Sequence, residues 1–320
     1  MLVNGEWQHD WHPFQNADSD GRFQRQTSSI RHWITPDGSA GPTGDAGFEA
    51  EPDRYHLYVA LICPWASRTL MVRALKGLEG LISVSVVEPE LSDQGWKFAP
   101  QDELIGADYL HQVYSSAVPD YTGRATVPVL WDKKRNTMVN NESADIVQML
   151  NSAFDRYSEL GVNAELNLRP SDIDQDAFNH FNQWLYNNVN NGVYKTGFAQ
   201  SQLAYAEAVH ALFKSLDQLE ERLTDQTWLW GDQLTESDIR LFVTLIRFDA
   251  AYYGLFKTNL KTLQSYPQLT RLCQQMLNQQ GVRQTINIDH IKRGYYSIKA
   301  LNPTGIVPQG PDLNYLGIQK

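Results

Sequence analysis

The sequence predicts an α/β domain followed by an all-α domain, and three observations support this fold class. An apolar, β-rich run over residues 54–60 passes at Cys63 into residues with helical spacing. Strand and helix patterns then alternate as far as residue 154, whereas after Arg169 the apolar residues recur at the three- and four-residue spacing of helices. We therefore expect an N-terminal arm (1–53), an α/β domain (54–160), an all-helical domain (161–293) and a C-terminal tail (294–320).

The α/β domain begins with a strand, a helix and a second strand, over 54–60, 64–78 and 81–87. This order predicts a right-handed βαβ unit with parallel strands. The segment that follows, 102–118, is expected to be part loop and part helix. A turn at 132–136 separates two short apolar runs and predicts a β-hairpin. The hairpin strands are expected at 127–131 and 137–140, and a helix is expected at 143–154, with Ser143 as its N-cap. The sum is a thioredoxin-like order of elements.

Four helical stretches are expected in the second half of the chain, at 171–189, 200–223, 236–256 and 266–279. Thr235 and Asp238 have the spacing of a capping box at the start of the third stretch. The tail from residue 294 contains several prolines and is expected to be extended or coil.

Composition excludes several classes of protein. The formal net charge is −10 and the sequence pI is about 5.3, so nucleic acid is not expected as a partner. The N-terminal residues have no apolar core of a signal peptide, and no stretch has the apolar length of a membrane span. Two cysteines in 320 residues favour a reducing compartment, and we expect a cytoplasmic protein.

Cys63 is the first candidate for chemistry, because it falls between a strand pattern and a helix pattern. Pro64 suits the first position of a helix, and the helix N-terminus favours a thiolate. Ala66 stands where a dithiol oxidoreductase carries its second cysteine, so an outside thiol must resolve any mixed disulfide at Cys63. The alternative is a small buried hydrophobic residue. We expect that role for Cys273, which lies in an apolar helix pattern.

A set of motifs spread over nearly the whole chain is similar to the glutathionyl-hydroquinone reductases, the Xi class of glutathione transferases. The most specific are Cys63-Pro-Trp-Ala and the Asn-Gly-Val-Tyr-Lys segment that contains Tyr194. The resemblance implies a thioredoxin-like, glutathione-binding domain and an all-helical glutathione-transferase C-terminal domain. Members of this family often carry His where this chain has Ser67. The further motifs are Gly95-Trp96, Thr126 to Asp132, Asn141-Glu-Ser143, Leu234 to Arg240, Arg247-Phe-Asp249, Asp289-His-Ile291 and Asn302 to Ile306.

The resemblance also implies the roles of individual residues. Cys63 is expected to be the nucleophile and Tyr194, which follows a predicted break in a helix, the proton donor to the leaving hydroquinone. Tyr252 and Tyr295 are expected to donate hydrogen bonds to the Cys63 thiolate. The expected glutathione-binding residues are Trp96, Arg124, Ala125, Thr126, Val127, Pro128, Glu142 and Ser143. The Val127–Pro128 peptide is expected to be cis and to face the cysteinyl part of glutathione.

The expected function is glutathione-dependent reduction of glutathionyl-hydroquinones by a homodimer, with glutathione as co-substrate. One alternative is an omega-like thiol transferase or dehydroascorbate reductase with the same chemistry at Cys63. The other is a non-catalytic, transferase-like module that binds partner proteins. His9 and His12 are spaced like a metal pair, but no further ligands complete a site, so no metal is expected.

Overall fold

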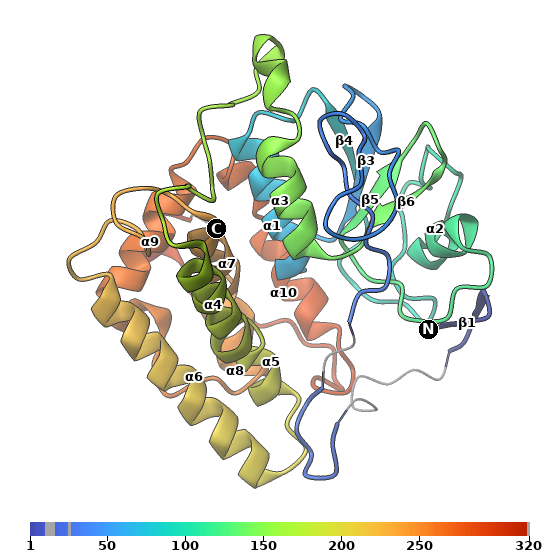
Figure 1. Cartoon of the computed structure of the whole chain (residues 1–320). Helices are drawn as coiled ribbons and strands as arrows, with labels where there is room; N and C mark the ends of the chain where they lie inside the picture. Colours follow the sequence, from blue (N-terminus) through green and yellow to red (C-terminus); the bar gives the residue numbers. More distant parts are fainter. Residues whose placement is uncertain (10–16, 25–26, 319–320) are drawn as a thin grey trace. The chain divides into compact units, whose positions relative to one another are not determined.

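The computed structural model describes residues 1–9, 17–24 and 27–318, which form two compact units (Figure 1). The described part of the first unit comprises residues 1–9, 27–167 and 280–294. That of the second unit comprises residues 17–24, 168–279 and 295–318. Because each unit is assembled from several stretches of the chain, the predicted domain boundaries after residues 53, 160 and 293 remain a proposal.

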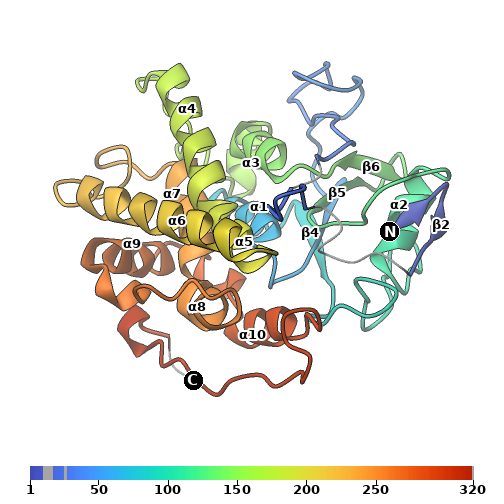
Figure 2. The same cartoon turned by 90° about the horizontal axis from the view of Figure 1, so that it is seen from below.

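The first unit is built on a four-stranded sheet in the order β4–β3–β5–β6. β3 pairs in parallel with β4, as the βαβ pattern predicts, and the predicted hairpin is the antiparallel pair β5–β6. α1 and α3 pack together on one face of the sheet, and α2 lies on the other side (Figures 1 and 2). The bounds are β1 Leu2–Val3, β2 Glu6–Trp7, β3 Tyr55–Val59, α1 Pro64–Leu75, β4 Ile82–Val86, α2 Leu110–Ala117, β5 Val129–Asp132, β6 Thr137–Asn140, α3 Ser143–Ser152, η2 Asp155–Leu160 and η6 Arg283–Thr285.

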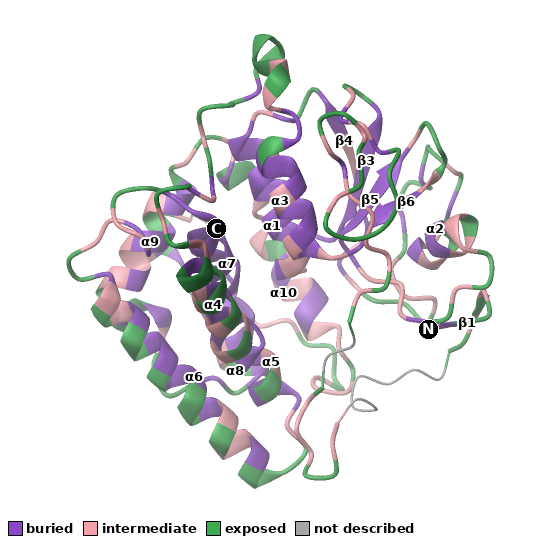
Figure 3. Cartoon of the chain, in the orientation of Figure 1, coloured by how far each residue is buried: buried purple, intermediate pink, exposed green. Residues whose placement is uncertain are grey.

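The core of the first unit lies between this sheet and α1. All five residues of β3 are buried, and so are most of those of α1 (Figure 3). Lys76 is the C-cap of α1, and the next residue is Gly77, whose φ is +67°. A Cβ on Gly77 would lie 2.4 Å from the carbonyl oxygen of Gly161, so this close approach of two backbones requires glycine.

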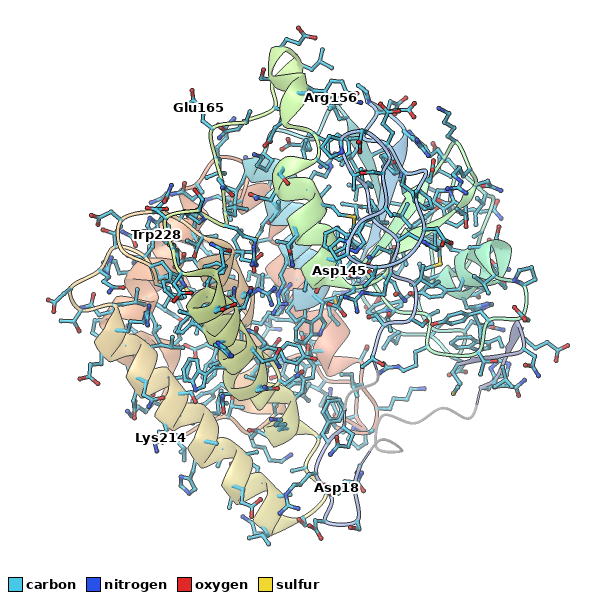
Figure 4. The ribbon with its side chains drawn as sticks, viewed as in Figure 1. Asp18, Asp145, Arg156, Glu165, Lys214 and Trp228 are labelled. Atoms are coloured by element: carbon cyan, nitrogen blue, oxygen red, sulfur yellow. The ribbon has the colours of Figure 1, made fainter. Side chains whose placement is uncertain are left out.

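The second unit is helical, and α7 is its most buried helix, since all of its residues are buried (Figure 3). The predicted capping box is confirmed: the Asp238 carboxylate accepts hydrogen bonds from the backbone N–H and the hydroxyl of Thr235. By contrast α6 is exposed along one face, from which Lys214 projects (Figure 4). The bounds are α4 Gln175–Leu185, η3 Tyr186–Asn190, α5 Gly192–Gly197, α6 Gln202–Arg222, α7 Glu236–Leu245, η4 Phe248–Tyr252, α8 Tyr253–Leu255, η5 Leu263–Ser265, α9 Pro267–Leu277 and η7 Asn314–Leu316.

Several expected elements differ from the structure. The helix expected at 171–189 begins later, at Gln175, because Asp174 caps it. The helix expected at 236–256 is interrupted after α7 by the π-helical turn η4. The tail is not extended or coil throughout, since a further helix, α10 (Ile288–Tyr296), runs into its first residues. Periodicity missed this helix because it is short and has only two aliphatic residues, Ile288 and Ile291.

The N-terminal arm contains regular structure that the sequence did not predict. β1 and β2 form a short hairpin, and Arg31 forms an antiparallel bridge with Asn140, at the edge of β6. The backbone N–H of His32 donates to the carbonyl oxygen of Val139 at 2.9 Å. Part of the arm therefore covers the open edge of the sheet.

Candidate active site

The topology of the first unit brings three of the predicted site segments to the same end of the sheet. β3 and β6 both run antiparallel to β5, so their carboxyl ends lie beside the amino end of β5. Cys63 follows β3, Glu142 follows β6 and Val127 precedes β5. Residues that are distant in sequence are therefore neighbours at the start of α1 and α3.

Cys63 occupies the N-cap position of α1, and Pro64 is the first helical residue, as predicted. The thiol is partly exposed, and its Sγ lies 3.6 Å from the carbonyl oxygen of Val127, to which it donates a hydrogen bond. The N-terminal N–H groups of α1 and the positive end of its dipole favour a negative charge at this position. Cys63 is thus placed to react as a thiolate.

Cys273 has the opposite environment. It lies in α9 and is fully buried, and this burial raises the pKa of its thiol far above the ordinary value. The Cys273 thiol therefore stays protonated and out of reach of solvent, in agreement with the predicted inert role.

This contrast predicts which cysteine iodoacetamide labels. Thiols at helix N-termini have pKa values of about 3.5–7.5 in proteins, whereas an ordinary thiol titrates near 8.5. We therefore expect rapid alkylation of Cys63 below pH 7 and alkylation of Cys273 on unfolding alone. Peptide mass spectrometry after timed labelling measures both rates, and preferential labelling of Cys273 in the folded protein would contradict the assignment.

The Val127–Pro128 peptide is cis, as predicted. Both residues are buried, whereas Arg124, Ala125 and Thr126 just before them are partly exposed. Trp96 is also partly exposed, on the loop that leads to α2, where its carbonyl oxygen accepts a hydrogen bond from the N–H of Leu110.

Glu142 and Ser143 open α3, but the prediction that Ser143 is the N-cap is wrong. Glu142 is the N-cap, since its carboxylate accepts from the N–H of Ala144 at 3.1 Å, whereas Ser143 is the first helical residue. The Oε2 of Glu142 also accepts, at 3.0 Å, from the hydroxyl of Ser28 in the arm. One turn on, Asp145 (Figure 4) pairs with Arg31, so the arm fixes the start of α3 at two points.

Tyr114 is a residue of this site that the sequence did not reveal. Its hydroxyl donates to the carbonyl oxygen of Thr126 at 2.7 Å and accepts from the side-chain amide of Asn141 at 3.2 Å. Burial raises the pKa of Tyr114 to about 12, so the phenol stays neutral. It ties the segment before Val127 to the segment before Glu142. The one available signal was its place beside Val113 in a short apolar pattern, which does not distinguish a bridging phenol from a core residue.

The three predicted tyrosines lie together in the second unit. The hydroxyl of Tyr295 is 2.7 Å from that of Tyr194 and 2.9 Å from that of Tyr252, which gives a continuous tyrosine chain, Tyr194–Tyr295–Tyr252. Tyr252 and Tyr295 are buried, whereas Tyr194 is partly exposed and forms the accessible end. Burial, reinforced by Tyr194, raises the pKa of both buried phenols well above 10, although the charge of the buried Arg247 acts in the opposite direction. The phenols of Tyr252 and Tyr295 therefore keep their protons at neutral pH.

The segments that carry Tyr194 and Tyr252 each contain a π-helical turn. η3 ends at Asn190, before α5, which bears Tyr194, so the break predicted from the Asn and Gly residues is confirmed. η4 ends at Tyr252 itself. Wide turns of this kind occur frequently at functional sites.

No group of three or more metal-ligating side chains is found among the described residues, and no described helix has the length and apolar character needed to span a bilayer. His9 is described, but His12 lies outside the described residues, so the pair considered above is not assessed by the structure.

Two family models match the chain. The model for the glutathione S-transferase N-terminal domain matches residues 62–153, and the model for the glutathione S-transferase C-terminal domain matches residues 202–275. These matches agree with the predicted fold class, a thioredoxin-like domain followed by a helical domain.

Curated relatives and solved structures are similar over almost the whole chain. Glutathionyl-hydroquinone reductase YqjG of Escherichia coli (strain K12) is 48% identical over 97% of this chain and 95% of the relative. PcpF of Sphingobium chlorophenolicum, a glutathionyl-hydroquinone reductase, is 48% identical over 97% of this chain and 96% of the relative. The glutathione-bound structure of YqjG covers 98% of this chain and 97% of its own, with a TM-score of 0.89 and 45% identity. The glutathione-S-transferase Xi of Phanerochaete chrysosporium covers 93% and 95%, with a TM-score of 0.86 and 45% identity.

Proposed function

The chain belongs to the glutathionyl-hydroquinone reductases, the Xi class of glutathione transferases, and we propose that it reduces glutathionyl-hydroquinones to hydroquinones with glutathione as co-substrate. The observation that carries this proposal is a single partly exposed thiol at the N-terminus of α1, with alanine at position 66.

The reaction has two steps. In the first, the Cys63 thiolate attacks the glutathione sulfur of the conjugate, the bond from that sulfur to the aromatic carbon breaks, and its electron pair leaves with the ring. The ring takes up a proton to give the hydroquinone, and a disulfide joins Cys63 to glutathione. In the second, the thiolate of another glutathione attacks this disulfide, which releases oxidised glutathione and the Cys63 thiolate. Ala66 makes the second step intermolecular.

The hydrogen bond between Cys63 and Val127 supports a mechanism by which bound glutathione promotes ionisation of the Cys63 thiol. The thiol now donates to the Val127 carbonyl oxygen. An extended peptide ligand can supply a backbone N–H to the same oxygen, as in strand addition. When the cysteinyl N–H of glutathione takes this place, it competes with the Cys63 thiol for the same oxygen, which favours the thiolate beside the start of α1.

The proposed glutathione site extends from Val127 and Pro128 to Glu142 and Ser143. The N-terminus of α3 suits the γ-glutamyl carboxylate, and the Glu142 carboxylate suits the ammonium group. The remaining members proposed for this site, which follow the family pattern, are Trp96, Arg124, Ala125 and Thr126.

Glu142 gives a test of this site. In a Cys63→Ala background, Glu142→Ala should weaken glutathione binding by ~1.5–3 kcal/mol, about tenfold or more, because it removes a charge-assisted contact. Titration calorimetry measures the affinity. Since Glu142 also caps α3, Glu142→Gln is the matched variant: it keeps an acceptor for the N–H of Ala144 but removes the charge. Unchanged affinity in both variants would place the ligand elsewhere.

The tyrosine chain is the proposed source of the proton. Tyr194, the accessible end, donates to the leaving hydroquinone, and Tyr295 can return a proton to it through their hydrogen bond. Tyr252 and Tyr295 are also proposed to donate hydrogen bonds to the Cys63 thiolate. The alternative omega-like thiol transferase needs no such acid, because it releases a thiolate.

The reaction also indicates the cellular compartment in which the protein acts. Each turnover consumes one reduced glutathione from solution and releases oxidised glutathione, so we propose a reducing, cytoplasmic compartment. We also propose that the protein is a homodimer and that the reaction requires no metal ion.

Steady-state assay of the wild-type protein with a glutathionylated hydroquinone tests the function. The expected products are hydroquinone and oxidised glutathione in equal amounts, with the parallel-line kinetics of a ping-pong mechanism. Rapid reduction of a small glutathione disulfide, without turnover of the conjugate, would favour the thiol transferase instead.

A further inference from the structure

The two helical segments that present Tyr194 and Tyr252 need a fixed separation if the tyrosine chain is to stay connected. Tyr194 follows η3, and Tyr252 ends η4, which follows α7. One π-helical turn ends at Asn190, four residues before Tyr194, and the other ends at Tyr252 itself. In η4 the carbonyl oxygen of Arg247 accepts from the N–H groups of Ala251 at 2.9 Å and of Tyr252 at 3.3 Å.

A buried asparagine joins these segments. Asn190, the last residue of η3, is 2% exposed, and its side-chain amide donates to the carbonyl oxygen of Arg240 at 2.7 Å and to the hydroxyl of Thr244 at 2.8 Å. Both acceptors belong to α7, one turn or two before η4 begins. We call this set of contacts the Asn190 bridge, formed by Asn190, Arg240 and Thr244.

A shift of the residues in the Asn190 bridge would move both Tyr194 and Tyr252. Asn190 is four residues before Tyr194, and the carbonyl oxygen of Thr244 accepts, at 3.2 Å, from the N–H of Arg247, the residue that precedes η4. Because Thr244 is 1% exposed, loss of its hydroxyl would leave a buried amide N–H of Asn190 without this acceptor. A π-helical turn has a wider, less regular hydrogen-bond pattern than an α-helix, so an external tie is an effective way to fix its end.

We propose that Asn190 is a positioning residue for the reaction: through Arg240 and Thr244 it holds Tyr194 at hydrogen-bonding distance from Tyr295 and thereby sets Tyr194 as the proton donor. The inference rests on the proposed function, in which Tyr194 protonates the leaving hydroquinone. It assigns Asn190 no contact with substrate.

Paired substitutions of Thr244 test the bridge. Thr244→Val keeps the volume but loses the hydroxyl, and Thr244→Ser keeps the hydroxyl but loses a methyl group. We expect Thr244→Val to lower kcat for a glutathionylated hydroquinone roughly 10- to 100-fold, the usual effect of an ångström-scale misplacement. Thr244→Ser should stay within about threefold of wild type. Reduction of a small glutathione disulfide, which uses Cys63 without an acid, should change little in either.

Asn190→Ala should behave as Thr244→Val does, with Asn188→Ala as its matched control. Asn188 lies in the same π-helical turn, but its amide bonds to the carbonyl oxygen of Trp184 in its own segment, so its loss should leave both reactions near wild type. If Thr244→Ser is the more damaging of the Thr244 pair, packing and not the hydrogen bond matters, and the inference is wrong. It is also wrong if Asn190→Ala and Thr244→Val slow both reactions equally, or neither.

The wild-type enzyme and Tyr194→Phe are measured in both reactions in the same series. Their rates show whether a failed test contradicts the Asn190 bridge or the proposed function. Selective loss of conjugate turnover in Tyr194→Phe, together with normal Thr244→Val and Asn190→Ala enzymes, overturns the Asn190 bridge alone. Absence of conjugate turnover in wild type overturns the function itself.

Discussion

Replacement of Cys63 by alanine should abolish reduction of glutathionyl-hydroquinones, a loss of roughly 10⁴-fold or more, as expected on removal of a catalytic nucleophile. No disulfide with glutathione can then form, so neither step of the reaction is possible. Cys63→Ser should be equally inactive, because a serine hydroxyl cannot take the place of sulfur in the mixed disulfide. Turnover is followed by the release of hydroquinone.

The chain offers a matched control in its second cysteine. Cys273→Ala removes a buried thiol from α9 and should keep activity, although loss of buried volume lowers stability by about 1 kcal/mol. Circular dichroism should show that both alanine variants are folded. Substantial turnover by folded Cys63→Ala would rule out the covalent mechanism.

Tyr194→Phe should slow turnover of glutathionyl-hydroquinones by ~10²–10⁴-fold, the usual contribution of a positioned general acid. Cleavage of a carbon–sulfur bond to an aromatic ring leaves a carbanion or phenolate equivalent, which needs a proton. Exchange of a small mixed disulfide at Cys63 releases a thiolate, which does not. The disulfide reaction of the variant should therefore be nearly normal, and the ratio of the two rates is the quantity to measure.

Tyr205→Phe is the control for this substitution. Tyr205 is a partly buried phenol of the second unit, and its hydroxyl donates to the carbonyl oxygen of Lys257, outside the tyrosine chain. The Tyr205→Phe variant should catalyse conjugate turnover and disulfide exchange at close to the wild-type rates. If Tyr194→Phe slows the two reactions equally, or neither, Tyr194 is a structural or binding residue and the thiol transferase becomes the better assignment.

Local sequence patterns predicted much of this fold because each pattern is typical of one local structure. A strand pattern that ends in Cys63-Pro64 indicated both β3 and the start of α1. The spacing of Thr235 and Asp238 indicated the start of α7, and the Asn and Gly residues before Tyr194 indicated a break in the helix. Each of these signals depends on residues within a few positions of one another.

The features that the sequence did not reveal depend on distant partners. Glu142 is the N-cap of α3, although glutamate is not a preferred N-cap residue, and its second oxygen accepts a hydrogen bond from Ser28, which lies far earlier in the chain. Tyr114 and Asn190 are ordinary residues of short patterns until Thr126 or Thr244 is placed beside them. The roles of Tyr194, Tyr252 and Tyr295 came from resemblance, since periodicity does not distinguish a catalytic tyrosine from a packed one.

The covalent mechanism is tested most directly by mass spectrometry of the intact protein after incubation with a glutathionylated hydroquinone in the absence of free glutathione. The mechanism predicts one glutathione bound by disulfide to the peptide that contains Cys63 and one equivalent of hydroquinone released. Addition of glutathione should then remove the adduct as oxidised glutathione. Release of hydroquinone from a protein whose Cys63 stays unmodified, or an adduct that carries the aromatic ring, would contradict the mechanism.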